Sequence, residues 1–345
     1  MAAKASTVSR NELSSNILQR LRAHTVHSIT SGPLMSATTT VTAAENRKSI
    51  LIVVGSVFLL SVSDALIKAT SAETSMWQLY VIRSLLAIGI IAAWLMRRGG
   101  TSQRWPLSPF WVGTRSLLLA LMWIAFYSAL PFISLTTAAL AIYTTPLFIA
   151  LFSAVTLDEH VTPRKWLAIL VGFAGVLVTL APSQADFNLW TLLPVLAAIF
   201  YALAAVVTKG KCANEVPMHL ALALNIALLL MGVIGSVVVL QTGPHLPDNE
   251  GLRFLLGGWS PMGIGDWGVM IVLAILMVLV STGIARAYQI GETSIIGAFD
   301  YTYLIFAIAW GALLFNEVLN SRTAAGLALI LISGFILLKK PTATR

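Results

Sequence analysis

The chain has 345 residues, of which 57% are hydrophobic and only 10% charged, with a mean hydropathy of +0.85. Such a chain has too little polar surface to cover a soluble globule, so its composition indicates a protein of the lipid bilayer. The formal charge of +8 does not indicate nucleic-acid binding, because the basic residues lie mostly in short loops between apolar runs. That placement is typical of a membrane topology signal, and we expect no nucleic-acid partner.

Residues 1–49 are rich in Ser, Thr and Ala and contain no long apolar run. We predict a disordered cytoplasmic tail here, with Met35 as an alternative start of the protein, and no secretory signal peptide. The stretch Ile17–Arg22 is weakly amphipathic and basic, which leaves an organelle transit peptide as the alternative interpretation.

Ten apolar runs follow, each long enough or nearly long enough to cross a hydrocarbon core of about 30 Å as a helix. The first five are predicted at Leu51–Lys68, Trp77–Met96, Phe110–Leu130, Leu135–Leu157 and Trp166–Leu180. The second five are predicted at Leu189–Thr208, Met218–Leu240, Trp267–Tyr288, Ser294–Phe315 and Ala324–Leu338. The predicted fold class is therefore an all-α integral membrane protein with ten transmembrane helices.

The stretch Ala138–Leu180 is repeated 158 residues later. The superposition pairs Tyr143 with Tyr301, Thr144 with Thr302, Phe148 with Phe306, Ala154 with Ala312, Glu159 with Glu317, and Arg164 with Arg322. A hydrophobic hairpin used twice predicts two similar halves, which we place at 50–182 and 188–340. Because each half has five spans, the two halves enter the membrane in opposite directions and form an inverted repeat.

The basic residues of the loops predict that both termini lie in the cytoplasm. With that orientation, twelve Lys and Arg residues from Arg47 onward lie inside and three outside, as the positive-inside rule requires; this count leaves out the N-terminal tail before Arg47 and the helix-embedded Arg83, Arg115 and Arg286. The three outside are Lys68, Arg253 and Arg322.

These features resemble the EamA family of the drug/metabolite transporter superfamily, whose members are paired five-helix units. The resemblance rests on YTTPLF…LDE…RKW…GFAGV and FDYTYLIFAIAWGALLFNE…SG near the ends of the halves, and on SDALIKATSAETSMWQLYVIRS near the start. It implies a secondary transporter of the bacterial inner (cytoplasmic) membrane that moves a small-molecule substrate by alternating access, without ATP. The opening segment is similar to members proposed to take up riboflavin or S-adenosylmethionine. Export of a metabolite or drug, proton coupling and a homodimer stay open.

Three charged residues near the start of the first half are candidate substrate-binding or coupling residues: Asp64, Lys68 and Arg83. Charges inside a span cost at least about 2.5 kcal/mol each on insertion scales, so they tend to face a cavity or a partner. Asp64 and Lys68 are four residues apart and share a helix face. The alternatives are a structural ion pair, with Lys68 extending to the headgroups, and an Arg83 that locks the first two helices together through Asp64.

In the second half the candidates are Asp300, Tyr301 and Thr302 in the ninth predicted span. A buried carboxylate such as Asp300 can take up a proton and release it on exposure to water, so we expect it to couple transport to protons. The alternative is a carboxylate that neighbouring hydroxyl groups satisfy, with no part in transport.

Tyr143 and Thr144 occupy the equivalent place in the fourth span, just before Pro146. A proline removes one helix hydrogen bond, and broken helices often frame a transporter site near the middle of the membrane. A kink used only for packing is the alternative. The second half has Leu304 in place of this proline, so its ninth span must be bent in another way or stay straight.

Other polar residues have simpler interpretations. Arg115 and Arg286 are predicted to anchor span ends, and Glu159 and Glu317 to form local salt bridges or helix caps, with a gate contact as the alternative. Tyr80 fits an interface belt. Five deeper aromatic residues are expected to be ordinary packing, with stacking on a flat substrate ring as the alternative: Trp123, Phe126, Tyr127, Tyr201 and Trp310.

The sequence contains no GxxxxGK[ST], HExxH or GxSxG motif, and its five histidines are scattered. We therefore expect no catalytic residue, no metal, no cofactor and no enzyme activity. A membrane-embedded enzyme and a non-transporting membrane subunit remain as rival interpretations.

Overall fold

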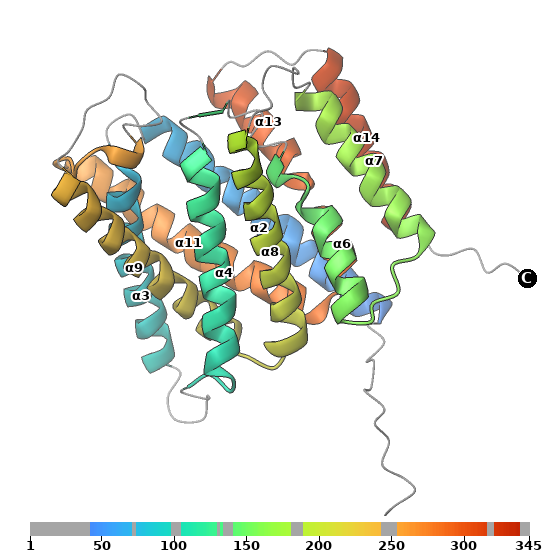
Figure 1. Cartoon of the computed structure of the whole chain (residues 1–345), viewed down its shortest axis with the longest axis horizontal. Helices are drawn as coiled ribbons and strands as arrows, with labels where there is room; N and C mark the ends of the chain where they lie inside the picture. Colours follow the sequence, from blue (N-terminus) through green and yellow to red (C-terminus); the bar gives the residue numbers. More distant parts are fainter. Residues whose placement is uncertain are drawn as a thin grey trace, which may run out of the picture. The chain divides into compact units, whose positions relative to one another are not determined.

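The computed structural model describes residues 42–70, 74–97, 105–129, 132–133, 141–180, 189–242, 254–315 and 321–338. Its principal elements are all helices: α2 (Ala43–Thr70), α3 (Met76–Arg97), α4 (Pro109–Ala129), α6 (Thr145–Thr156), α7 (Pro163–Leu180), η2 (Leu189–Thr191), α8 (Leu192–Lys211), α9 (Pro217–Thr242), α11 (Ile264–Ile290), α12 (Thr293–Phe299), α13 (Thr302–Phe315) and α14 (Ser321–Leu338) (Figure 1). The predicted tail up to residue 41 and the side chains of Lys68 and Glu317 lie outside the described residues.

Within the described ranges, nine helices are long and apolar enough to cross a membrane, with α12 and α13 counted together as one span. The shorter apolar helix α6 belongs to the fourth predicted span, whose first part, 134–140, lies outside the described residues. The prediction of an all-α, ten-helix membrane protein is confirmed.

The surface of the bundle exposes large apolar side chains, which would be unfavourable in water. Leu240 on α9 is 77% exposed, Leu313 on α13 is 72% exposed and Phe335 on α14 is 70% exposed. Contiguous apolar surface of this kind is solvated by lipid chains, whereas the helices satisfy their own backbone groups internally. The protein is therefore a multi-pass membrane protein.

The first helix begins earlier than predicted. Residues 43–49, which we assigned to the tail, are the first turns of α2. The reason is a capping box: Thr42 Oγ1 accepts a hydrogen bond from Glu45 N–H at 3.2 Å, and the Glu45 carboxylate accepts one from Thr42 N–H at 2.8 Å.

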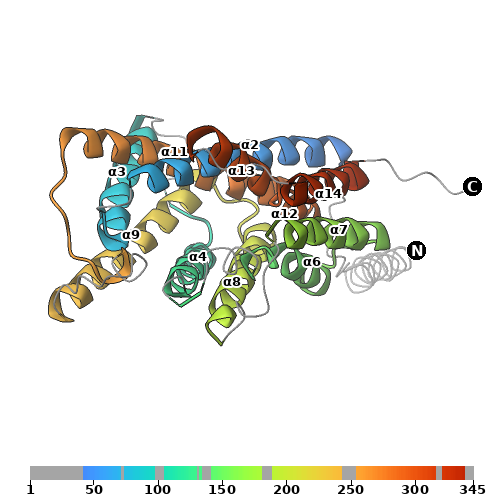
Figure 2. The same ribbon diagram turned by 90° about the horizontal axis from the view of Figure 1, so that it is seen from above.

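Helices from the two ends of the sequence pack side by side. The most extensive pairings are α7 with α14, α4 with α8, α2 with α11, and α3 with α9. Figures 1 and 2 show the α7–α14 pair on one side of the bundle and the α3–α9 pair on the other. In the predicted repeat, each of the first five spans corresponds to one of the second five. Under this correspondence the α4–α8 pair is equivalent to the α11–α2 pair, and the α7–α14 and α3–α9 pairs each consist of two equivalent helices.

The α7–α14 pairing depends on two glycines. A Cβ atom on Gly175 would lie 2.7 Å from the carbonyl oxygen of Gly326, and a Cβ atom on Gly326 would lie 2.6 Å from that of Gly175. Glycine at both positions lets the two helix backbones touch, a contact typical of membrane helices.

The fourth and ninth spans are both interrupted, at Tyr143–Thr144 and at Asp300–Tyr301. At each interruption a threonine hydroxyl donates to the carbonyl oxygen three residues earlier: Thr144 Oγ1 to Ala141 at 2.6 Å and Thr302 Oγ1 to Phe299 at 2.7 Å. These two bonds are related by the 158-residue shift of the repeat.

A proline accompanies only the first interruption. Pro146 has no N–H to offer Ile142, whose carbonyl oxygen instead accepts from Thr145 Oγ1 at 2.6 Å. The second interruption forms without proline, because Leu304 N–H bonds to the Tyr301 carbonyl three residues back, at 3.1 Å. The ninth span is therefore bent in another way, as the sequence analysis left open.

Candidate functional site

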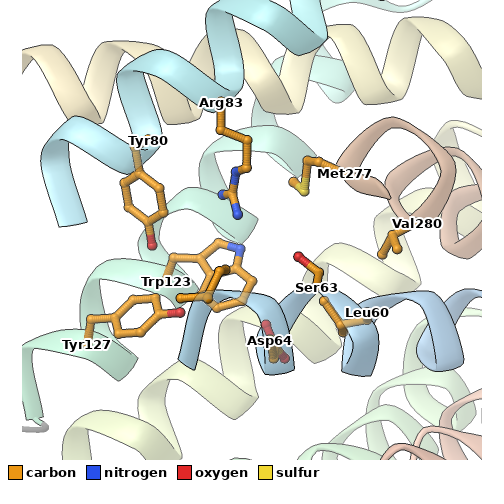
Figure 3. A pocket seen from close by; sticks show the side chains of 10 residues that line it. Leu60, Ser63, Asp64, Tyr80, Arg83, Trp123, Tyr127, Met277 and Val280 are labelled. Atoms are coloured by element: carbon orange, nitrogen blue, oxygen red, sulfur yellow. The ribbon is translucent and has the colours of Figure 1, made fainter. Parts of the chain in front are cut away.

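A small cavity lies between helices of both predicted halves. Its walls come from α2, α3, α4 and α11, and Figure 3 shows its polar side chains converging on one space. The lining residues are Leu60, Ser63, Asp64, Ile67, Tyr80, Arg83, Trp123, Tyr127, Met277 and Val280. The cavity has a volume of about 20 Å³, which is enough for one water molecule. The structure therefore has the cavity in a closed conformation.

Helical spacing explains why these side chains gather. On α2 the lining residues are at positions 60, 63, 64 and 67, which form one face of a helix. Tyr80 and Arg83 are three residues apart on α3, and Trp123 and Tyr127 are four apart on α4. Each pair therefore lies on one face of its helix.

The two charged residues of the cavity do not pair with each other. Asp64 Oδ2 accepts a hydrogen bond from Tyr303 Oη on α13 at 2.6 Å. Arg83 is 6% exposed, its Nε has no hydrogen-bond partner, and its guanidinium lies 5.4 Å from the centre of the Tyr80 ring. Within the described residues, the one ion pair closer than 4.0 Å is Lys165–Glu292, so Arg83 does not lock the first two helices together through Asp64.

Aromatic rings form one wall of the cavity. The Trp123 and Tyr127 rings stack with centroids 5.4 Å apart and an interplanar angle of 13°, and the Tyr80 ring lies 6.3 Å from Tyr127. We expected Trp123 and Tyr127 to be packing residues and Tyr80 to be an interface residue. All three instead border the two charges (Figure 3).

Asp300 lies apart from this cavity, at the interruption between α12 and α13. Its Oδ2 accepts from Tyr288 Oη at 2.9 Å, and its buried Oδ1 lacks a hydrogen bond of good geometry. The Tyr201 ring lies 6.4 Å from the Tyr288 ring, which adds a second phenol to this group. Asp300 does not line the cavity that contains Asp64 and Arg83.

Tyrosines connect the two carboxylates. Tyr303, which donates to Asp64, follows Asp300 by three residues on the same interrupted span. The Tyr143 ring lies 6.5 Å from the Tyr303 ring and 6.3 Å from the Tyr301 ring. The predicted tyrosines of the two halves therefore meet, whereas the hydroxyls of Thr144 and Thr302 bond to backbone carbonyls.

A second polar group, which we call the Glu159 cluster, consists of Asn46, Glu159, Lys165 and residues 292–294. The Glu159 carboxylate accepts from the N–H groups of Thr293 at 3.0 Å and Ser294 at 3.2 Å, at the start of α12. Lys165 pairs with Glu292, and Asn46 Oδ1 accepts from Glu292 N–H at 2.8 Å. Glu159 is thus a helix cap, as predicted in kind, but it caps a helix of the other predicted half.

Further polar contacts lie at the turn after α8. The Glu215 carboxylate accepts from Leu107 N–H at 3.1 Å and Ser108 N–H at 2.6 Å, at the start of α4. Gln289 Nε2 donates to the carbonyl oxygens of Cys212 and Glu215 at 2.7 and 2.9 Å. Cys212 is fully buried, and burial raises the pKa of its thiol to about 11.

Arg115 corrects one of the simpler interpretations. It is 3% exposed and donates to Thr208 Oγ1 at 2.9 Å and to the Leu220 carbonyl at 3.3 Å. The residue therefore ties α4 to α8 and α9 inside the bundle, and it is not a lipid-headgroup anchor. Arg286, by contrast, is exposed.

This architecture defines a class: a multi-pass helical membrane protein with buried charges in a cavity among its spans, as in membrane carriers. Residues 47–181 match the model of the EamA-like transporter family. Residues 47–181 therefore carry an EamA-like transporter family domain, and the chain is similar to transporters of that kind.

Curated relatives share this assignment at modest identity. The chain is 26% identical to a pseudopaline exporter of Pseudomonas aeruginosa over 298 residues, which are 83% of this chain and 94% of the relative. It is 31% identical to a riboflavin transporter of Vibrio cholerae, over 55% of this chain and 58% of the relative. It is 24% identical to an S-adenosylmethionine uptake transporter of Rickettsia bellii, over 65% of this chain and 70% of the relative.

A crystal structure of another protein has the same fold. It superposes with a TM-score of 0.69 at 19% sequence identity, covering 85% of this chain and 96% of the other. At this identity the likeness establishes the fold alone.

Proposed function

We propose that the protein is a secondary transporter that moves a small metabolite across the bacterial inner membrane by alternating access, without ATP or a cofactor. The observation that carries the proposal is the cavity itself, because its walls come from three helices of the first half and from α11 of the second. A site between two halves is exposed to either side of the membrane when the halves move relative to each other.

Two features support the division into halves at 50–182 and 188–340. The helix pairings are symmetric when the halves are exchanged. The interruptions of the fourth and ninth spans also use the same threonine bond at repeat-related positions. We take the two halves as the moving parts.

The distribution of basic loop residues supports an orientation with both termini in the cytoplasm. In this orientation the Glu159 cluster faces the cytoplasm. Its contacts between the halves close that end, and opening requires the N–H groups at the start of α12 to leave the Glu159 carboxylate.

Asp300 is the proposed coupling residue. Its carboxylate is buried beside Tyr288, with no cation paired to it among the described residues. Ionising such a group is costly until water reaches it, so a conformational change can drive proton uptake and release. The Asp300→Asn variant should lose pH-gradient-driven accumulation and keep exchange, whereas equal loss of both would make the residue structural.

The test of the function is counterflow in proteoliposomes that contain the purified protein. Riboflavin, S-adenosylmethionine and a mixture of amino acids are loaded inside, and uptake of each labelled compound is measured with and without a pH gradient. Saturable counterflow of one compound is the expected result. Its absence for all of them, in both membrane orientations, would contradict the proposal. The direction of any net flux then decides between uptake and export.

A further inference from the structure

The cavity contains one positive and one negative side chain, Arg83 and Asp64, which do not form an ion pair with each other. Arg83 is 6% exposed and lacks a partner at Nε, and no described carboxylate lies within 4.0 Å of its guanidinium. Asp64 has a hydroxyl donor, Tyr303, but no cation within that distance among the side chains that the structure describes, which do not include Lys68. A buried guanidinium without a partner is unfavourable, so an anionic group that arrives from outside the chain would stabilise it.

The same cavity presents flat aromatic faces. Trp123 and Tyr127 are stacked nearly parallel, and Tyr80 holds the Arg83 guanidinium near its ring. Figure 3 shows Arg83 reaching from α3 toward Trp123, with Asp64 on the neighbouring α2. A planar guanidinium suits a carboxylate, a lone carboxylate suits an ammonium group, and an aromatic wall suits an apolar body.

From this arrangement we propose that the cavity binds a small zwitterion: a carboxylate on Arg83, an ammonium group on Asp64, and an apolar or aromatic body against Trp123 and Tyr127. The inference rests on the proposed transport function and adds the substrate class to it. The cavity has about 20 Å³ in this structure, so the ligand enters only when the surrounding helices separate.

Tyr303 Oη donates to Asp64 Oδ2 from α13, so the carboxylate that would receive the ammonium group also ties α2 to the interrupted ninth span. A carboxylate can accept from both groups at once, since it has two oxygens. Ligand binding at Asp64 therefore takes place at a contact between the halves.

The test compares ligands that differ only in charge, with the protein in lipid nanodiscs and thermal protection as the readout. L-Tryptophan carries both charges, its methyl ester carries the ammonium group alone, and indole-3-propionate carries the carboxylate alone. Riboflavin serves as an uncharged flat ring. We expect L-tryptophan to protect at a concentration at least about tenfold lower than either singly charged analogue, because each lost charge pair reduces affinity at least that much.

Two variants assign the charges. Arg83→Gln should remove the advantage of L-tryptophan over the methyl ester and keep its advantage over indole-3-propionate. Asp64→Asn should do the reverse. Arg286→Gln and Asp158→Asn are matched controls, since both side chains are exposed and neither lines the cavity.

Three results would overturn the zwitterion assignment: stronger protection by riboflavin, equal protection by the three indole compounds, or no protection by these compounds and by all twenty amino acids. Riboflavin counterflow together with riboflavin protection would keep the transport function and reject the zwitterion. Zwitterion binding without counterflow of any compound would keep the ligand class and reject transport.

Discussion

Two pairs of opposite charges among the described residues, Lys165 with Glu292 and Arg83 with Asp64, are arranged differently. Lys165 and Glu292 pair directly, within a cluster whose other acceptors are filled by backbone N–H groups. Asp64 and Arg83 share a cavity without pairing. The first pair closes a contact between parts of the protein, whereas the second is the proposed binding site for a ligand.

The largest expected effect on ligand binding comes from Arg83→Met, which removes the unpaired charge at similar volume. Ligand affinity should fall at least tenfold, or about 1.4 kcal/mol, whereas the melting temperature in detergent should stay level or rise, because a buried charge is replaced by an apolar group. Ligand affinity and melting temperature are measured on the same preparation of the variant and of the wild type. A melting temperature that falls with affinity would mean that Arg83 supports the fold.

Glu159→Ala tests the paired region. The variant leaves two N–H groups at the start of α12 without their charged acceptor, so we expect a loss of about 1–3 kcal/mol of stability. Thermal unfolding in detergent measures the loss. Glu159→Gln is the matched control, because it keeps an acceptor oxygen and should lose less. Equal losses in the two variants would contradict the capping role.

Thr144→Val and Thr302→Val extend the comparison to uncharged groups. Each removes a hydroxyl that satisfies a carbonyl oxygen at an interrupted span, so each should cost about 1 kcal/mol, again visible in thermal unfolding. The serine variants at the same positions keep the hydroxyl and should unfold like the wild type. If only one valine variant is destabilised, the two interruptions are not equivalent.

The smallest effect concerns the single cysteine, Cys212. A buried thiol with a pKa of about 11 holds little thiolate at neutral pH, so alkylation by N-ethylmaleimide should be slow at pH 7 and rise as pH approaches 11. Mass spectrometry of the intact protein follows the reaction. Glu159→Ala should accelerate it if loosening the Glu159 cluster also loosens the turn after α8. Rapid labelling of the wild type at pH 7 would show that this end opens readily.

The spans and the repeat were predictable because apolar runs and a duplicated hairpin can be recognised in the sequence without knowledge of the fold. Asp64 and Arg83 could be singled out for a similar reason, since a charge within an apolar run is costly wherever the helix faces. The structure places both residues in one cavity, and their roles in binding stay a prediction.

The rest depends on how helices turn toward one another. Tyr80, Trp123 and Tyr127 were assigned to the interface or to packing because depth along a span does not reveal which face meets a cavity. The partner of Glu159 was missed because it lies 134 residues away, beyond any local pattern. The second interruption has no proline, and its threonine bond is a signal only when compared with Thr144.

The glycine contact between α7 and α14 bears on how such a molecule can move. Backbones that touch at Gly175 and Gly326 leave no side chains to slide past one another, and any larger residue would wedge them apart. A junction of this kind suits a pivot, about which the remaining helices can swing while these two stay joined. The α3–α9 pair, on the opposite side of the bundle, would then travel furthest.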